Sequence, residues 1–335
     1  MLNEFRQDLV SGEWVLFATE RGKNLTSKSR FEFYQPKEDC PFEETKIGEQ
    51  EVVWAEPSGK DWWAAVIKNK YPAVRPGPFK PEYEYGPFKI QLAVGDHEVI
   101  VFRDHDKGFD EFSREELVKA IQVYKRRYKE LSAQEYGGYS VIFHNHGREA
   151  GASIYHTHSQ IISTPILPPD ISRSLYGSFR YYRKYGKRVY DVLLDWESKQ
   201  KKRIVYENDD FVAFSPFVSK YPYEIRIFPK ESHAHFDKMP DAKDPSFADA
   251  FYVSLQKMKI ALKKPSFNFF IHTAPSAENK AFREEFGVNL HDFYHWHMEI
   301  IPHLKIDAGF EIGTGIEINV VDPDESAEIL RNVKI

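Results

Sequence analysis

The sequence predicts an α+β protein in which one series of elements occurs twice along the chain. Between residues 62 and 160, the hydrophobic patterns indicate strand, strand, helix, strand, loop and strand, in that order. Between residues 211 and 301 the same order returns, and two histidines separated by one residue lie in the last strand of each series. Because the order recurs while most residues differ, we interpret the chain as an old duplication.

The first copy combines two kinds of hydrophobic pattern. Short apolar runs between turn residues predict strands at 62–74, 97–102 and 139–143. Segment 113–131 instead carries apolar residues at helical spacing. Ser113 and Glu116 stand three positions apart at its start, as in a capping box, so we expect a helix there.

The second copy has matching segments. Strands are predicted at 211–216, 223–229, 267–272 and 293–301, and helices at 249–262 and at the chain end, 322–332. The polar segment 273–292 is expected to be a loop that reaches toward the active site. We therefore divide the chain into an N-terminal half at 1–164, a connector with a helix at 165–204, and a C-terminal half at 205–335.

Composition and charge restrict the class of protein. A chain of 335 residues, 41% of them hydrophobic, is long enough to bury a substantial core. The net charge is −5 and there is no long Lys/Arg block, which argues against nucleic acid as a partner. No stretch approaches the roughly 18 apolar residues of a membrane helix, and the N-terminus lacks a secretion signal, so we expect a cytoplasmic protein without a membrane partner.

The segment from 143 to 160 carries the strongest chemical signal. In a strand, alternate residues share a face, so His156, His158 and Gln160 are expected to line one site. The preceding run contains Gly147 and Gly151, and such a loop lets backbone N–H groups approach an anion. An imidazole beside a phosphate site indicates nucleophilic attack on phosphorus. The alternative is a set of polar residues on an exposed strand edge.

A second histidine pair favours the chemical interpretation. His295 and His297 stand in a strand-like run near the other end of the chain. The segment Gly-Ala-Ser-Ile-Tyr-His-Thr-His-Ser-Gln, 151–160, also resembles the signature of galactose-1-phosphate uridylyltransferases, which belong to the histidine-triad superfamily. The resemblance extends over nearly the whole chain. It implies two histidine-triad-like halves with mostly antiparallel sheets and flanking helices, the first half carrying the nucleophile.

The resemblance also implies a reaction and its catalytic residues. His158 would attack the α-phosphorus of a nucleotide sugar to give a covalent nucleotidyl-histidine, and a hexose 1-phosphate would then accept the nucleotidyl group, as in a UDP-glucose–hexose-1-phosphate uridylyltransferase. Gln160 would donate to a phosphoryl oxygen. The partners would be a nucleotide sugar and a sugar phosphate, and relatives are homodimers that share the active site between subunits.

Further residues are implied as substrate contacts, because they stand where relatives bind nucleotide, phosphate or sugar. They are Arg21, Asn69, Asn145, Ser153, Lys305 and Glu311. The last two belong to a glycine-rich tail, 305–317, that resembles the hexose-binding tail of the family and could alternatively be a hairpin. Asn24, Ala308 and Glu317 depart from the family pattern. His144 and His146 have no assigned role.

A structural metal site is the next implication. Many relatives have Cys-x-x-Cys where this chain has Cys40 and Glu43, and His105 and His156 supply two further ligands by analogy. We expect one zinc ion on these four residues. Cys40 is the only cysteine, which excludes an intramolecular disulfide.

A second metal site is not expected. Some relatives place a second metal on three histidines of the second copy and a connector glutamate. His272, His295 and His297 occupy the histidine positions, but Ser174 stands where the glutamate would be.

Three alternatives to the uridylyltransferase reaction remain. A nucleotide-sugar or dinucleoside polyphosphate phosphorylase would use the same His158 intermediate with inorganic phosphate as acceptor. A hydrolase would use water. A non-catalytic nucleotide- or metal-binding protein would have lost turnover. The sequence alone does not identify the base, uridine or adenosine, or the hexose.

Overall fold

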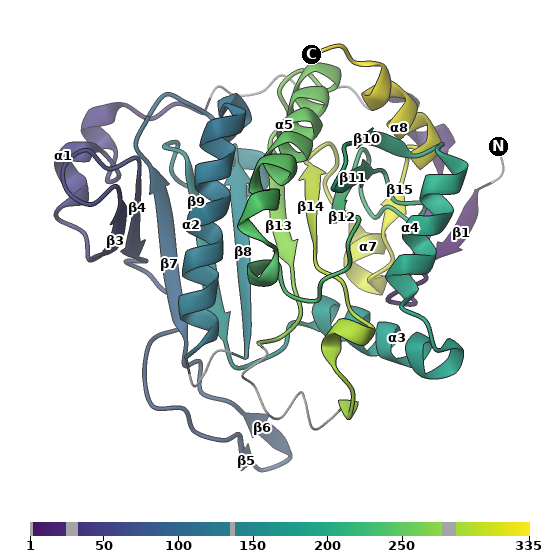
Figure 1. The fold of residues 1–335 in the computed structure, drawn as a ribbon, viewed down its shortest axis with the longest axis horizontal. Helices are drawn as coiled ribbons and strands as arrows, with labels where there is room; N and C mark the ends of the chain where they lie inside the picture. The colour runs from purple at the N-terminus through teal and green to yellow at the C-terminus, as the bar shows by residue number, and fades with distance from the viewer. Residues whose placement is uncertain (1–2, 25–32, 135–137, 277–285) are drawn as a thin grey trace.

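A ten-stranded sheet, to which each half of the chain contributes five strands, forms the frame of the molecule (Figure 1). The computed structural model describes residues 3–24, 33–134, 138–276 and 286–335. From one edge to the centre, the first half contributes β3 (Val52–Glu56), β4 (Ala64–Lys68), β7 (Asp96–Phe102), β9 (His158–Thr164) and β8 (Tyr139–His146). From the other edge, the second half contributes β10 (Ile204–Glu207), β11 (Phe211–Phe214), β12 (Ile225–Pro229), β14 (His297–Pro302) and β13 (Phe267–His272).

The strand order confirms the predicted duplication. The histidine-bearing strand β9 lies between β7 and the central strand β8, just as β14 lies between β12 and the central strand β13, and all these pairings are antiparallel. The two halves meet where β8 pairs with β13, also antiparallel. The strands of both halves therefore belong to one continuous sheet of an α+β fold. The division of the chain at residues 164 and 205 stays a prediction.

Two long helices cover one face of this sheet. Helices α2 (Arg114–Ser132) and α5 (Asp244–Ala261) lie side by side across it (Figure 1). The apolar stripe of α2 is buried at Leu117, Ile121 and Tyr124, and the predicted capping box is present at its start. Helix α5 begins earlier than the predicted residue 249, since Pro245 is favourable in a first helical turn.

The histidine strands begin later than predicted. Strands β9 and β14 start at His158 and His297, so His156 and His295 lie in the segments just before them. The ladder between β7 and β9 ends at the pair of Val101 and His158, and no residue before His158 belongs to it. The expectation that both histidines of a pair belong to one strand was wrong.

The remaining elements surround the sheet. The connector forms two helices instead of one, α3 (Pro169–Tyr185) and α4 (Val189–Gln200), and the glycine-rich tail forms a short helix, α7 (Gly309–Thr314), not a hairpin. The other described strands and α-helices are β1 (Glu4–Gln7), β2 (Trp14–Phe17), α1 (Glu44–Ile47), β5 (Tyr83–Tyr85), β6 (Phe88–Ile90), β15 (Ile318–Asn319) and α8 (Pro323–Asn332).

Two sequence expectations have simple structural outcomes. Of the predicted loop at 273–292, residues 277–285 lie outside the described residues. Among the described helices, none combines the length and apolar character needed to span a membrane.

Candidate active site

Strand β9 presents His158 and Gln160 on the face of the sheet that α2 does not cover. Between them, Ser159 points the other way and its hydroxyl lies 2.6 Å from the Tyr124 hydroxyl on α2 and 3.1 Å from His144 Nδ1. This buried contact fixes the rotation of the strand about its axis. The side chains of His158 and Gln160 therefore point away from the helices, as their spacing predicted.

His158 has a defined tautomer. Its Nδ1 lies 2.8 Å from the backbone carbonyl oxygen of His156, and because a carbonyl only accepts, Nδ1 must donate the proton. The ring is 7% exposed, and burial lowers the pKa of His158, which favours the neutral form. The Nε2 atom then carries an unshared electron pair. An imidazole held in this way can act as a nucleophile near neutral pH.

Gln160 is held by two side chains from neighbouring segments. Its Oε1 lies 2.8 Å from His97 Nε2 and 3.4 Å from Asn69 Nδ2. The structure thus brings the predicted residue Asn69 to the site. Sequence reasoning missed His97, since it is one of three polar residues at the start of β7 and no pattern there singles it out.

Asn145 lies near the end of β8, and Ser153 lies on the segment that connects β8 to β9. Asn145 Oδ1 accepts a hydrogen bond of 2.7 Å from Asn268 Nδ2, which ties the two halves together at the sheet centre. Gly147 has φ +84°, and a Cβ there would lie 2.2 Å from Ser266 Oγ, so the turn requires glycine. Ser153 is exposed after this turn.

The four residues expected to bind zinc do come together. Their ligand atoms all lie within 4.8 Å of one another. Cys40 Sγ is 3.5 Å from His156 Nδ1, and Glu43 Oε1 is 2.5 Å from His105 Nδ1 and 3.7 Å from His156 Nδ1. One sulfur, one oxygen and two nitrogens from buried or half-buried side chains form a donor set typical of zinc.

The surroundings of this cluster also suit a metal ion. The other ring nitrogen of each histidine faces a backbone carbonyl oxygen. His156 Nε2 lies 2.5 Å from the carbonyl oxygen of Phe102, and His105 Nε2 lies 2.8 Å from that of Gln35. Both Nδ1 atoms are thereby left as acceptors that face the cluster. Within the described residues, Glu43 Oε1 and His105 Nδ1 are buried with no hydrogen-bond partner beyond their contact with each other, as expected of ligand atoms.

Arg21, Lys305 and Glu311 lie elsewhere in the chain. Lys305 Nζ pairs with Glu317 at 2.5 Å and with Asp307 at 3.3 Å, and Glu311 accepts from the backbone N–H of Ala308 at the start of α7. In the described part of the chain, no hydrogen bond or ion pair links any of the three predicted residues to His158.

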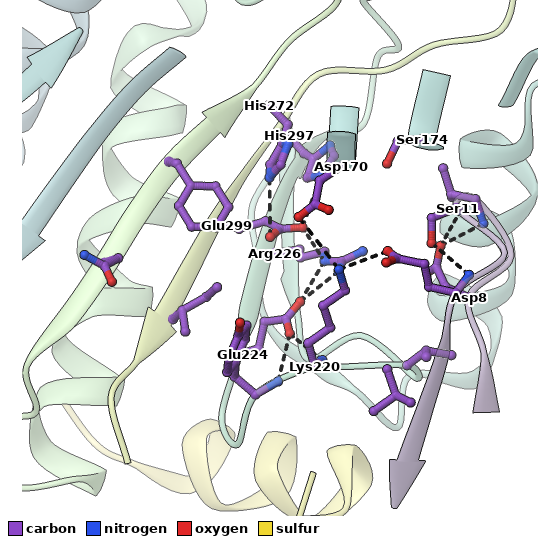
Figure 2. Close-up of a pocket in the computed structure, with 18 of the residues that line it drawn as sticks. Asp8, Ser11, Asp170, Ser174, Lys220, Glu224, Arg226, His272, His297 and Glu299 are labelled. Atoms are coloured by element: carbon purple, nitrogen blue, oxygen red, sulfur yellow. Dashed lines mark hydrogen bonds and ion pairs between the residues drawn. The ribbon is translucent and has the colours of Figure 1, made fainter. Parts of the chain in front are cut away.

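The second half carries a pocket on the same face of the sheet, with a volume of about 290 Å³ (Figure 2). His272, His297 and Glu299 converge there, and each histidine Nε2 lies 3.4 Å from a Glu299 oxygen. Arg226 bridges Glu299 at 2.8 Å and Glu224 at 2.9 Å. His295 is not part of this cluster.

The pocket in the second half repeats the local geometry of His158. His297 Nδ1 lies 3.3 Å from the carbonyl oxygen of His295, as His158 Nδ1 faces that of His156. Gln160 and Glu299 also lie in one row across the sheet, linked by successive cross-strand pairs through Phe143 and Phe270. Glu299 is therefore the second-half equivalent of Gln160.

The two equivalent sites differ in charge. Burial raises the pKa of Glu299, but the adjacent Arg226 guanidinium outweighs this effect and holds the pKa well below its usual value. An ionised carboxylate would repel a phosphate at the position where Gln160 offers an amide. The second half therefore has a negative charge beside its histidine where the first half has a neutral amide.

The repeated α+β half, with a His-x-His-x-Gln segment in the first copy only, indicates a nucleotidyltransferase. Comparisons with known proteins support this class and specify the family. A family model described as the N-terminal domain of galactose-1-phosphate uridyl transferase matches residues 3–168. The chain belongs to the galactose-1-phosphate uridylyltransferase family.

Relatives in this family span the whole chain. An ADP-glucose phosphorylase from Arabidopsis thaliana is 30% identical, over 99% of this chain and 93% of its own length. A galactose-1-phosphate uridylyltransferase from Thermotoga maritima is 28% identical over 99% of both chains. The crystal structure of the Arabidopsis phosphorylase with bound ADP-glucose superimposes with a TM-score of 0.82 at 29% identity and covers both chains completely.

Proposed function

We propose that the protein moves a nucleoside monophosphate between a nucleotide sugar and a hexose 1-phosphate by two displacements at phosphorus. His158 Nε2 attacks the α-phosphorus, the new P–N bond forms, and the P–O bond to the departing hexose 1-phosphate breaks. A phosphate oxygen of the acceptor then attacks the same phosphorus and releases His158. The observation that carries this proposal is the bond of 2.8 Å between His158 Nδ1 and the His156 carbonyl, which leaves Nε2 available.

Neighbouring groups would stabilise the charge on the phosphoryl oxygens. Gln160 donates from its amide nitrogen, and backbone N–H groups near Ser153 donate to the phosphate from the loop that precedes β9. Asn69 and Asn145 line the nucleotide or sugar. These roles rest on the family resemblance together with the contacts of Asn69 to Gln160 and of Asn145 at the sheet centre.

We propose further that the active unit is a homodimer in which the tail of one chain serves the nucleophile of its partner. Lys305 and Glu311 are assigned to the hexose phosphate by resemblance, yet they make no described contact with His158 in their own chain. Arg21 joins this group, since its charge acts on Glu311. The single cysteine suits a reducing, cytoplasmic compartment.

A structural zinc ion is part of the proposal. Cys40, Glu43, His105 and His156 would hold it, and it would fix the segment whose carbonyl oxygen bonds to His158. We assign no metal to the second half, because the Arg226 guanidinium already neutralises Glu299 there.

A second candidate is a nucleotide-sugar phosphorylase with inorganic phosphate as acceptor. The Arabidopsis relative is an ADP-glucose phosphorylase, and it is 30% identical to this chain. The ion pairs of Lys305 with Glu317 and Asp307 also favour it, because they neutralise the lysine assigned to a hexose phosphate.

The two candidates differ in the compound that discharges the intermediate. The purified protein would be incubated with UDP-glucose or ADP-glucose alone, and intact-mass spectrometry would detect a nucleotidyl adduct. Galactose 1-phosphate and inorganic phosphate would then be added separately. Discharge of a uridylyl adduct by the hexose phosphate alone would support the uridylyltransferase, and discharge of an adenylyl adduct by phosphate would support the phosphorylase. No adduct with either nucleotide sugar would refute both.

A further inference from the structure

His97 links a backbone turn to the side chain of Gln160. The residue lies near the start of β7 and is 8% exposed. Its Nδ1 accepts a hydrogen bond of 3.1 Å from the backbone N–H of Ala73, and its Nε2 lies 2.8 Å from Gln160 Oε1. The Nε2 atom also lies 3.1 Å from Asn69 Nδ2, so the Ala73 N–H is the partner whose hydrogen-bond direction is fixed.

These partners determine the tautomer of His97. A backbone N–H only donates, so Nδ1 must be unprotonated. Burial lowers the pKa of His97, which keeps the ring neutral with a single proton. That proton must lie on Nε2, and the ring must donate it to the carbonyl oxygen of the Gln160 amide.

Asn69 constrains the same amide from a second side. Its Oδ1 accepts the backbone N–H of Tyr71 at 2.8 Å, which fixes the orientation of its own amide group. The Asn69 Nδ2 therefore faces Gln160 Oε1, at 3.4 Å. Since two donors converge on one oxygen, the amide nitrogen of Gln160 must point the other way. Within the described residues, no protein acceptor bonds to that nitrogen.

We infer that His97 is a positioning residue that turns the Gln160 amide so that its NH₂ group, and not its oxygen, faces the phosphoryl group on His158. The inference rests on the proposed function for the presence of that phosphoryl group. A reversed amide would present a carbonyl oxygen to an anion and would lose one stabilising donor. His97 itself touches neither the substrate nor the reacting atoms.

Two substitutions separate the two bonds of His97. Asparagine places an oxygen near the position of Nδ1, so His97→Asn keeps the bond from Ala73 and loses the donor to Gln160. Glutamine reaches the position of Nε2, so His97→Gln keeps a donor to Gln160 and loses the bond to Ala73. If His97 only anchors the turn, the asparagine variant must be the milder of the two.

The readout is the single-turnover rate of nucleotidyl adduct formation. Removal of a whole transition-state donor costs about 10²–10³-fold, so we expect His97→Asn to slow the step by roughly 10- to 100-fold with little change in the substrate concentration at half-saturation. His97→Gln should stay within a few-fold of the natural protein. The reverse order, or equal losses in both variants, would overturn the inference.

A double-mutant cycle tests whether His97 acts through Gln160. In a Gln160→Ala background there is no amide to orient, so His97→Asn should cost little further rate. Full additivity of the two losses would contradict the assigned role.

The tautomer can be measured independently of activity, by nitrogen NMR of the protein labelled with ¹⁵N at its histidine rings. The His97 signals are those that disappear in the His97→Gln variant. We expect a protonated Nε2 and an unprotonated Nδ1, and a proton on Nδ1 would overturn the inference. If the natural protein forms no adduct with UDP-glucose or ADP-glucose, the proposed function fails, whereas the tautomer still decides the orientation of Gln160.

Discussion

At the scale of single residues, the two halves share a histidine geometry and differ in what surrounds it. His158 and His297 are each held by the carbonyl two residues earlier, and their strands occupy equivalent places in the sheet. The difference is an amide at Gln160 against a carboxylate at Glu299, together with Arg226 in the second half only. We propose that this difference in charge restricts the chemistry to the first half.

Gln160→Glu tests this view directly, because it creates in the first half the residue type of the second. A carboxylate removes the donor and adds repulsion, so adduct formation should fall by at least about 10²–10³-fold. The matched control is Gln160→Ala, which removes the donor alone. Rapid-quench measurement should find the glutamate variant slower than the alanine variant, and the opposite order would contradict the electrostatic argument.

Glu299→Gln should cost stability and not catalysis. Breaking a buried ion pair by neutralising one partner costs about 3–5 kcal/mol, and Arg226 keeps only Glu224 in this variant. Urea denaturation would give the free energy of unfolding. The exposed Glu4→Gln is the control and should change it by no more than about 0.5 kcal/mol.

The loss in Glu299→Gln should depend on pH. The pKa of Glu299 is lower in the folded state than in the unfolded state, so its stabilisation is complete above the unfolded value of about 4.3. It is lost as the pH falls further. The difference in unfolding free energy between the natural protein and the variant should therefore shrink below about pH 4. A difference that grows on acidification would show that Glu299 is not the ionised partner.

At the scale of elements, strand β9 is fixed from both sides at its start. Ser159 bonds to Tyr124 and His144 on the helix side, and His156 belongs to the Cys40 cluster on the other side. The carbonyl of His156 is the group that sets the His158 tautomer. Disruption of the Cys40 cluster should therefore affect catalysis, because it would move the His156 carbonyl group.

Cys40→Ser should remove the metal and slow the enzyme. We expect about one zinc per chain in the natural protein and a large reduction in the variant, with a roughly 10- to 100-fold slower adduct formation. Elemental analysis and single-turnover kinetics would measure the two effects. Glu43→Cys is the control that keeps four ligands and should retain zinc. Retention of full zinc content in Cys40→Ser would refute the cluster as the metal site.

At the scale of the whole molecule, the nucleophile and the tail lie on different halves of the chain. In a symmetric dimer, the tail of each chain would lie beside His158 of its partner. Mixing His158→Gly with Lys305→Ala would then create heterodimers in which one site carries both defects and the other carries neither. A fully re-equilibrated equimolar mixture should recover about a quarter of the natural activity with galactose 1-phosphate as acceptor. Failure to recover any activity would contradict a site shared between chains.

Much of this architecture could be predicted from the sequence, because local patterns determine it. The duplicated order of elements, strand 267–272 and the capping box at Ser113 were confirmed. The Cys40 cluster assembles from three distant segments, and only the family resemblance indicated it. His97 and Arg226 were missed, because their partners depend on cross-strand register, which single-sequence patterns do not specify.

The most direct test of the central claim is the position of the nucleotidyl group on the protein. The adduct formed from UDP-glucose or ADP-glucose would be digested and mapped by tandem mass spectrometry that preserves the P–N bond. We predict modification of His158, no adduct in His158→Gly, and an undiminished adduct in His297→Asn. A label on His297 or on another residue, or an adduct that persists in His158→Gly, would contradict the assignment of the nucleophile.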